Sequence, residues 1–106
     1  MRTLEFIVDK QRLRKSPHCS FSAIVAGSVG YLQATFKFSD DWNGYKKAAS
    51  FWVGEKEYPV LLDENNSCVI PEKALVGEVF EVSVTGMDDS KHFIPTTKIK
   101  VKQEVQ

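Results

Sequence analysis

The chain alternates hydrophobic and polar residues with a period of two in three clear segments, residues 4–8, 32–38 and 80–84. Because successive side chains of a β-strand point to opposite faces, each segment predicts a strand with one buried face. The apolar positions of these and of neighbouring segments define the expected core. We expect the core to contain Phe6, Val8, Leu32, Phe36, Phe38, Phe51, Val60, Leu62, Ile70, Leu75, Phe80, Val82 and Val84.

Five weaker strand candidates lie around these segments. Turn-forming residues, mainly Gly, Asp, Asn and Ser, separate nearly all of them. Seven or eight short strands at this spacing are typical of a β-sandwich or a barrel. We therefore predict an all-β fold, a single domain over residues 1–106 built as an antiparallel β-sandwich of seven or eight short strands. The weaker candidates are residues 19–25, 48–53, 57–62, 67–70 and 98–101.

Helical signals are almost absent from the sequence. The best candidate is residues 71–76, where Pro71 suits the first helical position, Glu72 suits the helix dipole and Gly77 ends the segment. This pattern predicts one short helical turn between two strands. Residues 11–15 are a second candidate for a short turn, which Pro17 would stop.

The 106 residues contain 14 Lys and Arg and 14 Asp and Glu, so the formal net charge is zero. A neutral chain has no overall field that would gather nucleic acid or an anionic membrane. No apolar run approaches the roughly 20 residues that a membrane-spanning helix needs. These features argue against nucleic-acid and membrane partners and favour an ordinary small globular domain.

The charge is uneven along the chain. Residues 1–53 contain eight basic and four acidic residues, so this half carries +4 and residues 54–106 carry −4. Such a distribution predicts a molecule with two faces of opposite charge. Complementary faces suit contacts with copies of the same chain or with one charged partner.

The sequence has no recognisable catalytic motif. His18 and Cys19 are the only adjacent pair that could be a base and a thiolate, but neighbouring side chains of a strand point apart. There is no Gly-rich phosphate-binding loop, no His-Glu-x-x-His and no Gly-x-Ser-x-Gly. We therefore expect a non-enzymatic protein with no catalytic residues and no cofactor.

Metal binding is not predicted either. Cys19 and Cys68 are too few and too far apart for a metal knuckle or a disulfide framework, so we expect two reduced thiols. The acidic segment 40–44 lacks the alternating oxygen ligands of a calcium loop. We expect instead a turn in which Asp side chains cap backbone amides and Trp42 covers the end of the sandwich.

Many of the aromatic residues are concentrated between residues 31 and 58. If Phe51 and Val53 face the core, Trp52 between them faces outward. An exposed Trp is a frequent anchor in protein interfaces. The alternative is that a neighbouring loop covers it.

Basic residues cluster near the N-terminus at Lys10, Arg12, Arg14 and Lys15. The alternatives are a solvated turn, a site for an acidic protein and a phosphate-binding patch. The absence of interleaved aromatic residues argues against nucleic acid. The predicted partner-binding residues are Trp42, Tyr45, Trp52, Lys46, Lys47, Arg12 and Arg14.

Several short motifs occur together in a fixed order. They are Asp41-Trp42-x-Gly44, the Lys- and Ala-containing strand that follows it to Phe51, Ile70-Pro71-x-x-x-Leu75 and Ile94-Pro95-Thr96-Thr97. The combination, which covers the chain from Leu4 to Val101, resembles the small β-sandwich modules that tailed phages and prophages of Gram-positive bacteria encode among their tail and baseplate genes. It is similar to the N-terminal domain of siphophage upper baseplate proteins.

The resemblance implies a structural or assembly protein of the virion that docks in a tail or baseplate through protein–protein contacts. Its partners would be other phage proteins or copies of itself, in a homo-oligomer or a multi-copy assembly. The alternative is a phage-encoded accessory binder in the host cytoplasm. Such a binder would inhibit a host or defence protein, or capture a small ligand, and the charge asymmetry favours it.

Overall fold

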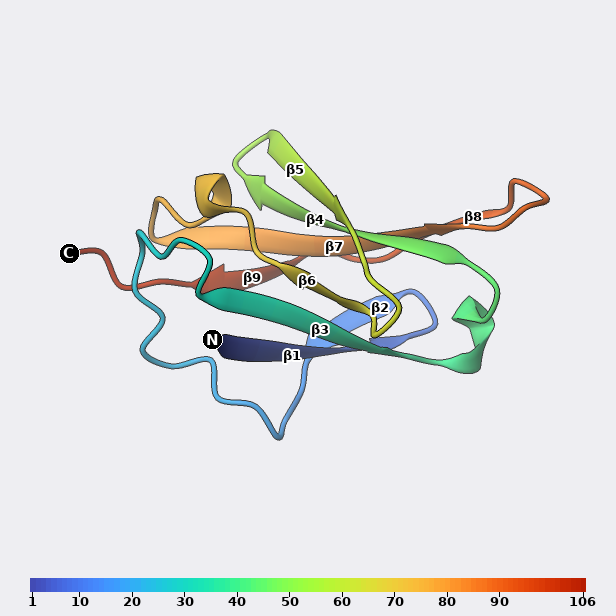
Figure 1. Ribbon diagram of the computed structural model, residues 1–106, viewed down its shortest axis with the longest axis horizontal. Coiled ribbons are helices and arrows are strands. Elements are labelled where there is room, and N and C mark those ends of the chain that lie inside the picture. Colours follow the sequence, from blue (N-terminus) through green and yellow to red (C-terminus); the bar gives the residue numbers. More distant parts are fainter.

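Nine β-strands and two single 3₁₀ turns make up the fold, and the computed structural model describes all residues 1–106 (Figure 1). The strands are β1 (Arg2–Asp9), β2 (Arg12–Lys15), β3 (Leu32–Phe38), β4 (Lys46–Val53), β5 (Lys56–Leu61), β6 (Ser67–Val69), β7 (Val79–Met87), β8 (Phe93–Pro95) and β9 (Ile99–Lys102). The 3₁₀ turns are η1 (Asp40–Trp42) and η2 (Glu72–Ala74). No element is a helix of the length and hydropathy that crossing a membrane requires.

The strands form two sheets that lie face to face. The first sheet has the order β2-β1-β3-β6, and the second has the order β5-β4-β7-β8, with β9 also paired to β7. Figure 1 shows β1 and β3 in one layer and β4 and β7 in the other. The predicted all-β, sandwich-like fold is therefore confirmed, with nine strands where seven or eight were expected.

One pairing departs from the predicted antiparallel arrangement. β1 and β3 pair in parallel, from Arg2 opposite Leu32 to Val8 opposite Phe38. The other ladders between named strands are antiparallel. Parallel and antiparallel strands share the same two-residue alternation, so the hydrophobic pattern could not distinguish them.

The core lies between the two sheets. Every predicted core residue faces it, although Phe38, Val60 and Leu62 are only partly buried. The alternation therefore identified the inward faces correctly. The core also contains buried residues that the prediction omitted, among them Leu13, Ile24, Trp42, Ala49 and Val101.

The segment 19–25 is not the predicted strand. It belongs to a long loop between β2 and β3, and only Val25 makes an isolated bridge, to Glu104. Ala23 has a φ of +55°, which ends an extended conformation. The guanidinium group of Arg2 holds this loop by donating to the carbonyl oxygens of Ser20, Ser22 and Ala23.

Two further segments differ from the prediction. Residues 12–15 form strand β2 in a hairpin with β1, where Leu13 pairs with Val8 and is buried, rather than the expected turn. β8 was not predicted, because three residues are too short to show alternation. The helical turn after Pro71 is confirmed as η2, which buries Ala74.

The turn at η1 differs from the prediction in its hydrogen bonds. No side-chain cap forms there, so the expected capping of backbone amides by Asp is wrong. Trp42 is fully buried, and its Nε1 donates a 2.7 Å hydrogen bond to the carbonyl oxygen of Lys10. The expectation that Trp42 covers one end of the sandwich is confirmed.

Candidate functional site

The structure does not bring the seven predicted partner-binding residues together. Arg12 and Arg14 belong to β2 in the first sheet, whereas Lys46 and Trp52 belong to β4 in the second. Tyr45 precedes β4 at the end of the sandwich that η1 closes. The predicted residues therefore mark two separate surfaces and one end of the fold.

Trp42 is not a contact residue. Its exposed fraction is 0%, and its ring lies against Gly86 of β7, where a Cβ atom would come within 2.8 Å of Cζ3. Partner binding through Trp42 is therefore excluded in the folded protein. The sequence of this turn was compatible with a Trp42 that binds a partner and with a Trp42 that packs in the core. Its complete burial shows that it packs in the core.

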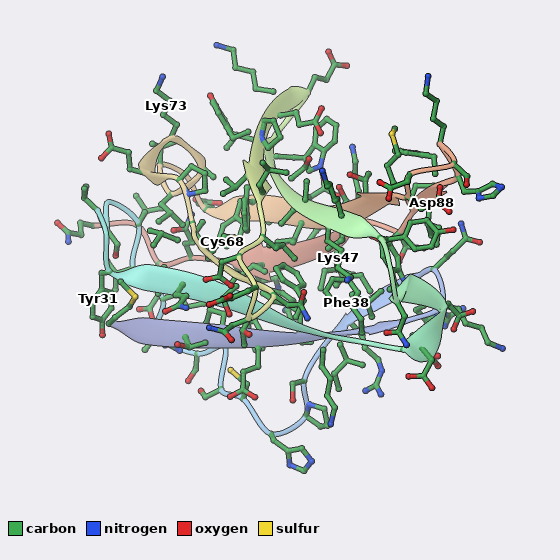
Figure 2. All side chains as sticks on the ribbon, turned by 45° about the vertical axis from the view of Figure 1, so that its right-hand side comes forward. Tyr31, Phe38, Lys47, Cys68, Lys73 and Asp88 are labelled. Carbon is green, nitrogen blue, oxygen red and sulfur yellow. The ribbon has the colours of Figure 1, made fainter.

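Tyr45 and Lys47 are half-buried and serve mainly the packing of this end. The Tyr45 ring packs edge-on against Trp42, with centroids 6.3 Å apart. Lys47 Nζ lies 5.2 Å from the ring centroid of Phe38 and donates to the carbonyl oxygen of Tyr45 at 3.2 Å (Figure 2). A cation held over an aromatic ring in this way is an attractive contact inside the chain. Of the two neighbouring lysines, only Lys46 is therefore exposed.

A shallow groove of about 470 Å³ runs beside these lysines. Its lining combines both charges with apolar side chains, and it is open to solvent. It has the size of a small-ligand site but few of the apolar walls that such sites use. The lining residues are Tyr45, Lys46, Lys47, Leu61, Leu62, Asp63, Glu64 and Asn66.

Trp52 faces outward, as the alternation predicted, and is half-buried. Its Nε1 donates to Ser83 Oγ at 3.0 Å, so the indole lies down across β7. Lys98 Nζ lies 3.6 Å from the ring centroid, which is close enough for a cation–π contact. The cover is thus a lysine from the segment before β9, and part of the indole remains at the surface.

Trp52 belongs to the outer face of the second sheet, a surface that we call the second-sheet face. The register places Leu61, Ala48, Thr85 and Pro95 in one row across β5, β4, β7 and β8. The next row contains Lys46, Met87 and Phe93. Its centre is formed by the small side chains of Ala48, Ser50, Ser83 and Thr85.

This face exposes large apolar side chains. Leu61 is 77% exposed, Phe93 56% and Met87 49%. The alternation of β5 and β7 assigns Leu61 and Met87 to the outside, where polar residues are expected, and the register with Met87 places Phe93 of β8 beside them. That conflict with the usual pattern is the sequence signal that could have found the face.

A second surface lies on the outside of the first sheet. Arg14 and Lys37 flank Ile7 in one row, and Arg12 pairs with Asp9 in the next. We call Arg12, Arg14 and Lys37 the basic row. No acidic side chain forms an ion pair with them, since the one ion pair of the chain joins His92 and Asp88. Three of the eight basic residues of the N-terminal half therefore lie on this face, where Asp9 is the register partner of Arg12, whereas Lys46 and Lys47 belong to β4 in the second sheet.

The acidic half does not form a matching opposite face. Glu57, Glu81, Lys98 and Lys100 all lie on the second-sheet face or beside it, so this surface carries both signs. The predicted pair of oppositely charged faces is thus not formed, because the outer face of the first sheet also carries Asp9 beside its basic residues. The register of the strands, rather than the position in the chain, decides where each charge lies.

The Asp88–His92 pair lies in the exposed turn between β7 and β8 (Figure 2). His92 Nδ1 lies 2.8 Å from Asp88 Oδ2, and the His92 amide donates to Asp88 Oδ1. Desolvation opposes ionisation of Asp88, but the hydrogen bonds and charge of His92 and the Ser90 amide outweigh it, so the pKa of Asp88 is lowered. This pairing of a carboxylate and an imidazole four residues apart was not predicted.

Neither cysteine forms a disulfide bond. Burial, and to a smaller extent the nearby Asp63 carboxylate, together raise the pKa of the Cys68 thiol to about 12. Cys68 is therefore neutral and poorly nucleophilic at pH 7. Cys19 Sγ contacts the backbone of β1 instead, where it accepts from the Glu5 amide at 3.3 Å.

No protein-family model and no curated protein sequence matches the chain. No group of three or more His, Cys, Asp or Glu side chains is arranged to hold a metal ion. The candidate functional sites of the molecule are its two outer surfaces, the second-sheet face and the basic row.

Proposed function

We propose that the protein is a non-enzymatic binding module of a phage particle, which docks in the tail or baseplate through protein–protein contacts. The observation that carries this proposal is the second-sheet face. A small domain that exposes Leu61, Met87 and Phe93 around a flat centre has an interaction surface rather than an ordinary solvated one.

The arrangement of the two surfaces supports a role in assembly. The second-sheet face and the basic row lie on the outsides of different sheets, so both can be occupied at once. A module that repeats in a particle needs contacts to more than one neighbour. The motif combination around Asp41-Trp42 and Ile70-Pro71 supports placing this module in a tailed phage.

The chemistry of the reactive groups supports a binding role rather than catalysis. The Cys68 thiol is buried and neutral, and His92 is exposed beside Asp88 with no hydroxyl or thiol hydrogen-bonded to its ring. A nucleophile and its base must lie within hydrogen-bond reach of each other. Such a pair is not formed by these groups.

The direct test is to purify phage particles and search for the protein by mass spectrometry. The proposal expects the protein in the particle, in a fixed ratio to a tail protein. It also expects that Leu61→Asp reduces incorporation at least about tenfold, as the loss of an apolar interface anchor does. Val29→Asp is the matched control, because Val29 is 70% exposed in the loop before β3.

Absence of the protein from intact particles that carry all other tail proteins would refute the proposal. The same result would favour the second candidate, an accessory binder in the host cytoplasm. The basic row supports that candidate, since Arg12, Arg14 and Lys37 form no ion pair within the chain. An acidic host protein would then bind the wild type and lose affinity for the Arg12→Glu/Arg14→Glu variant.

A further inference from the structure

We propose that the second-sheet face binds the same face of a second copy of this chain, around a two-fold axis that runs along the strands between β4 and β7. The inference rests on the proposed function, because a module that repeats in a particle meets other copies of itself. It adds the identity of the partner and the orientation of the contact.

The strand register shows why this axis fits. A two-fold axis parallel to the strands keeps each row at its own level and reverses the order of strands within it. In the row of Leu61, Ala48, Thr85 and Pro95, Leu61 then meets Pro95 of the second copy, and Ala48 meets Thr85. Both contacts join apolar or small groups.

The charged row is complementary under the same operation. Glu57, Trp52, Glu81 and Lys100 share one row across β5, β4, β7 and β9. Reversal places Glu57 against Lys100 of the second copy, at both ends of the interface. Opposite charges at the rim favour the correct register more than they add affinity.

Reversal also places Trp52 against Glu81 of the second copy. Lys98 lies over the Trp52 indole, at 3.6 Å from the ring centroid. The Lys98 ammonium group therefore meets the Glu81 carboxylate across the interface. The Lys98–Glu81 contact is thus a second pair of opposite charges on each side of the axis.

The alternative axis, perpendicular to the strands, does not fit. It would place β5 against β5 of the second copy with the rows reversed. Glu57 would then meet the chain beyond Leu61, where Asp63 and Glu64 follow. Like charges at this position oppose that arrangement.

The shape of the face also suits sheet-on-sheet packing. The centre consists of the small side chains of Ala48, Ser50, Ser83 and Thr85. Ser50 and Ser83 are already buried in the monomer, because Ser50 Oγ donates to the Glu57 carboxylate and the Trp52 indole donates to Ser83 Oγ, so that both larger side chains lie down on the sheet. Two such surfaces can approach closely with their strands nearly aligned, as paired sheets do. Leu61, the most exposed apolar side chain of the face, then loses its contact with water against Pro95 of the second copy, whereas Met87 meets Lys46.

The size of the face sets the expected affinity. Four strands about 4.8 Å apart and four rows about 6.8 Å apart cover roughly 500 Å². This area is smaller than that of a standard specific interface, in which each partner buries about 800 Å², and is typical of weak or transient contacts. We therefore expect a reversible dimer that dissociates in the micromolar range.

The experiment is sedimentation velocity of the full chain from about 1 to 500 μM, a range that brackets a micromolar dissociation constant. The wild type is expected to shift from monomer to dimer. Leu61→Asp is expected to raise the dissociation constant at least about tenfold, and Val29→Asp to leave it unchanged. A wild type that is monomeric throughout, or equal weakening by Val29→Asp, overturns the inference.

A charge exchange tests the orientation. Glu57→Lys alone should weaken the dimer, because it faces Lys100 of the second copy. Glu57→Lys/Lys100→Glu should recover most of the lost affinity, since each copy then presents the opposite pair. Both variants lose the hydrogen bond from Ser50 Oγ to Glu57, so they are compared with each other. A double variant that dimerises as weakly as Glu57→Lys, at the same melting temperature as Glu57→Lys, would overturn the assigned axis.

The outcome is separable from that of the proposed function. A dimer in solution with no protein in purified particles would support the interface and refute the virion role. A strict monomer found in particles would refute the interface and leave the virion role supported. The two experiments therefore fail independently.

Discussion

The indole nitrogen of Trp42 donates a 2.7 Å hydrogen bond to the carbonyl oxygen of Lys10, at the tip of the hairpin between β1 and β2. The six-membered ring of the same side chain lies against the backbone of Gly86 in β7. Trp42 therefore joins the first sheet to the second at one end of the sandwich. This relationship explains why a residue with the appearance of a surface anchor is buried.

Trp42→Phe should lower the free energy of unfolding by about 2 kcal/mol, because a smaller ring leaves a cavity and the Lys10 carbonyl loses its donor. Urea denaturation followed by circular dichroism measures the change. Trp52→Phe is the matched control, since it also removes an indole but lies on the outer face. An equal or larger loss from Trp52→Phe would contradict the assigned role of Trp42.

Gly86→Ala should cost about 1 to 3 kcal/mol, because its Cβ would come within 2.8 Å of Trp42 Cζ3 and 3.3 Å of Tyr45 Cβ. The cost should fall in the Trp42→Phe background, since the smaller ring leaves room for the added methyl group. A double-mutant cycle measures this coupling. Strictly additive effects would show that the ring and the glycine do not constrain each other.

Arg2→Met should release the loop between β2 and β3, because the guanidinium group donates to three of its carbonyl oxygens at 2.7 to 3.0 Å. Methionine keeps an apolar stem of similar length and removes the donors. Hydrogen exchange should accelerate at residues 20–26 and stay unchanged in β7. Arg14→Met, which removes no hydrogen bond or ion pair within the chain, should leave the exchange of the loop as it is.

Cys68 should make the protein less stable at high pH. The thiol pKa rises from 9.0 to about 12 on folding, so the native state binds more protons than the unfolded state between these values. Stability is therefore complete below pH 9 and falls as pH rises toward 12, with a slope of about 1.4 kcal/mol per pH unit at most. Cys68→Ala should show a shallower loss in that window than the wild type, when melting is compared at pH 8 and about 10.5.

Asp88 should respond to acid in the opposite direction. Its folded pKa lies below 3.8, so its contribution is present above the unfolded pKa and disappears as pH falls through the folded value. The His92 amide, which donates to Asp88 Oδ1, reports this event in an acid titration by nuclear magnetic resonance. Asp88→Asn should remove that titration step. A His92 amide that titrates identically in the variant would assign the step to another group.

The central strands were predicted well from the sequence. Each is paired with neighbouring strands along both edges, and its inward side chains show a regular hydrophobic alternation. Phe80, Val82 and Val84 alternate within β7 and are all buried between β4, β8 and β9. Their pattern is local, so no knowledge of distant residues was needed. The same holds for the outward direction of Trp52.

The errors arise where distant residues decide the local conformation. Residues 19–25 alternate like a strand, yet the hydrogen bonds from Arg2 and the positive φ of Ala23 make them a loop. Burial of Trp42 depends on Gly86, which the local pattern does not reveal. The candidate site was divided for a related reason, since Arg12 and Trp52 are placed on different sheets by the pairing order.

The parallel ladder between β1 and β3 has a consequence for the kinetics of folding. Thr3 and Gln33 are register partners, but the β1–β2 hairpin and the loop that Arg2 holds lie between them in the chain. Closing such a segment costs conformational entropy before the β1–β3 contacts can stabilise the chain. The β1–β2 hairpin can form within microseconds, whereas a complete first sheet must wait for β3, so refolding is expected in milliseconds to seconds. During that delay the unpaired edge of β1 is the part of the chain most exposed to misassociation with other chains.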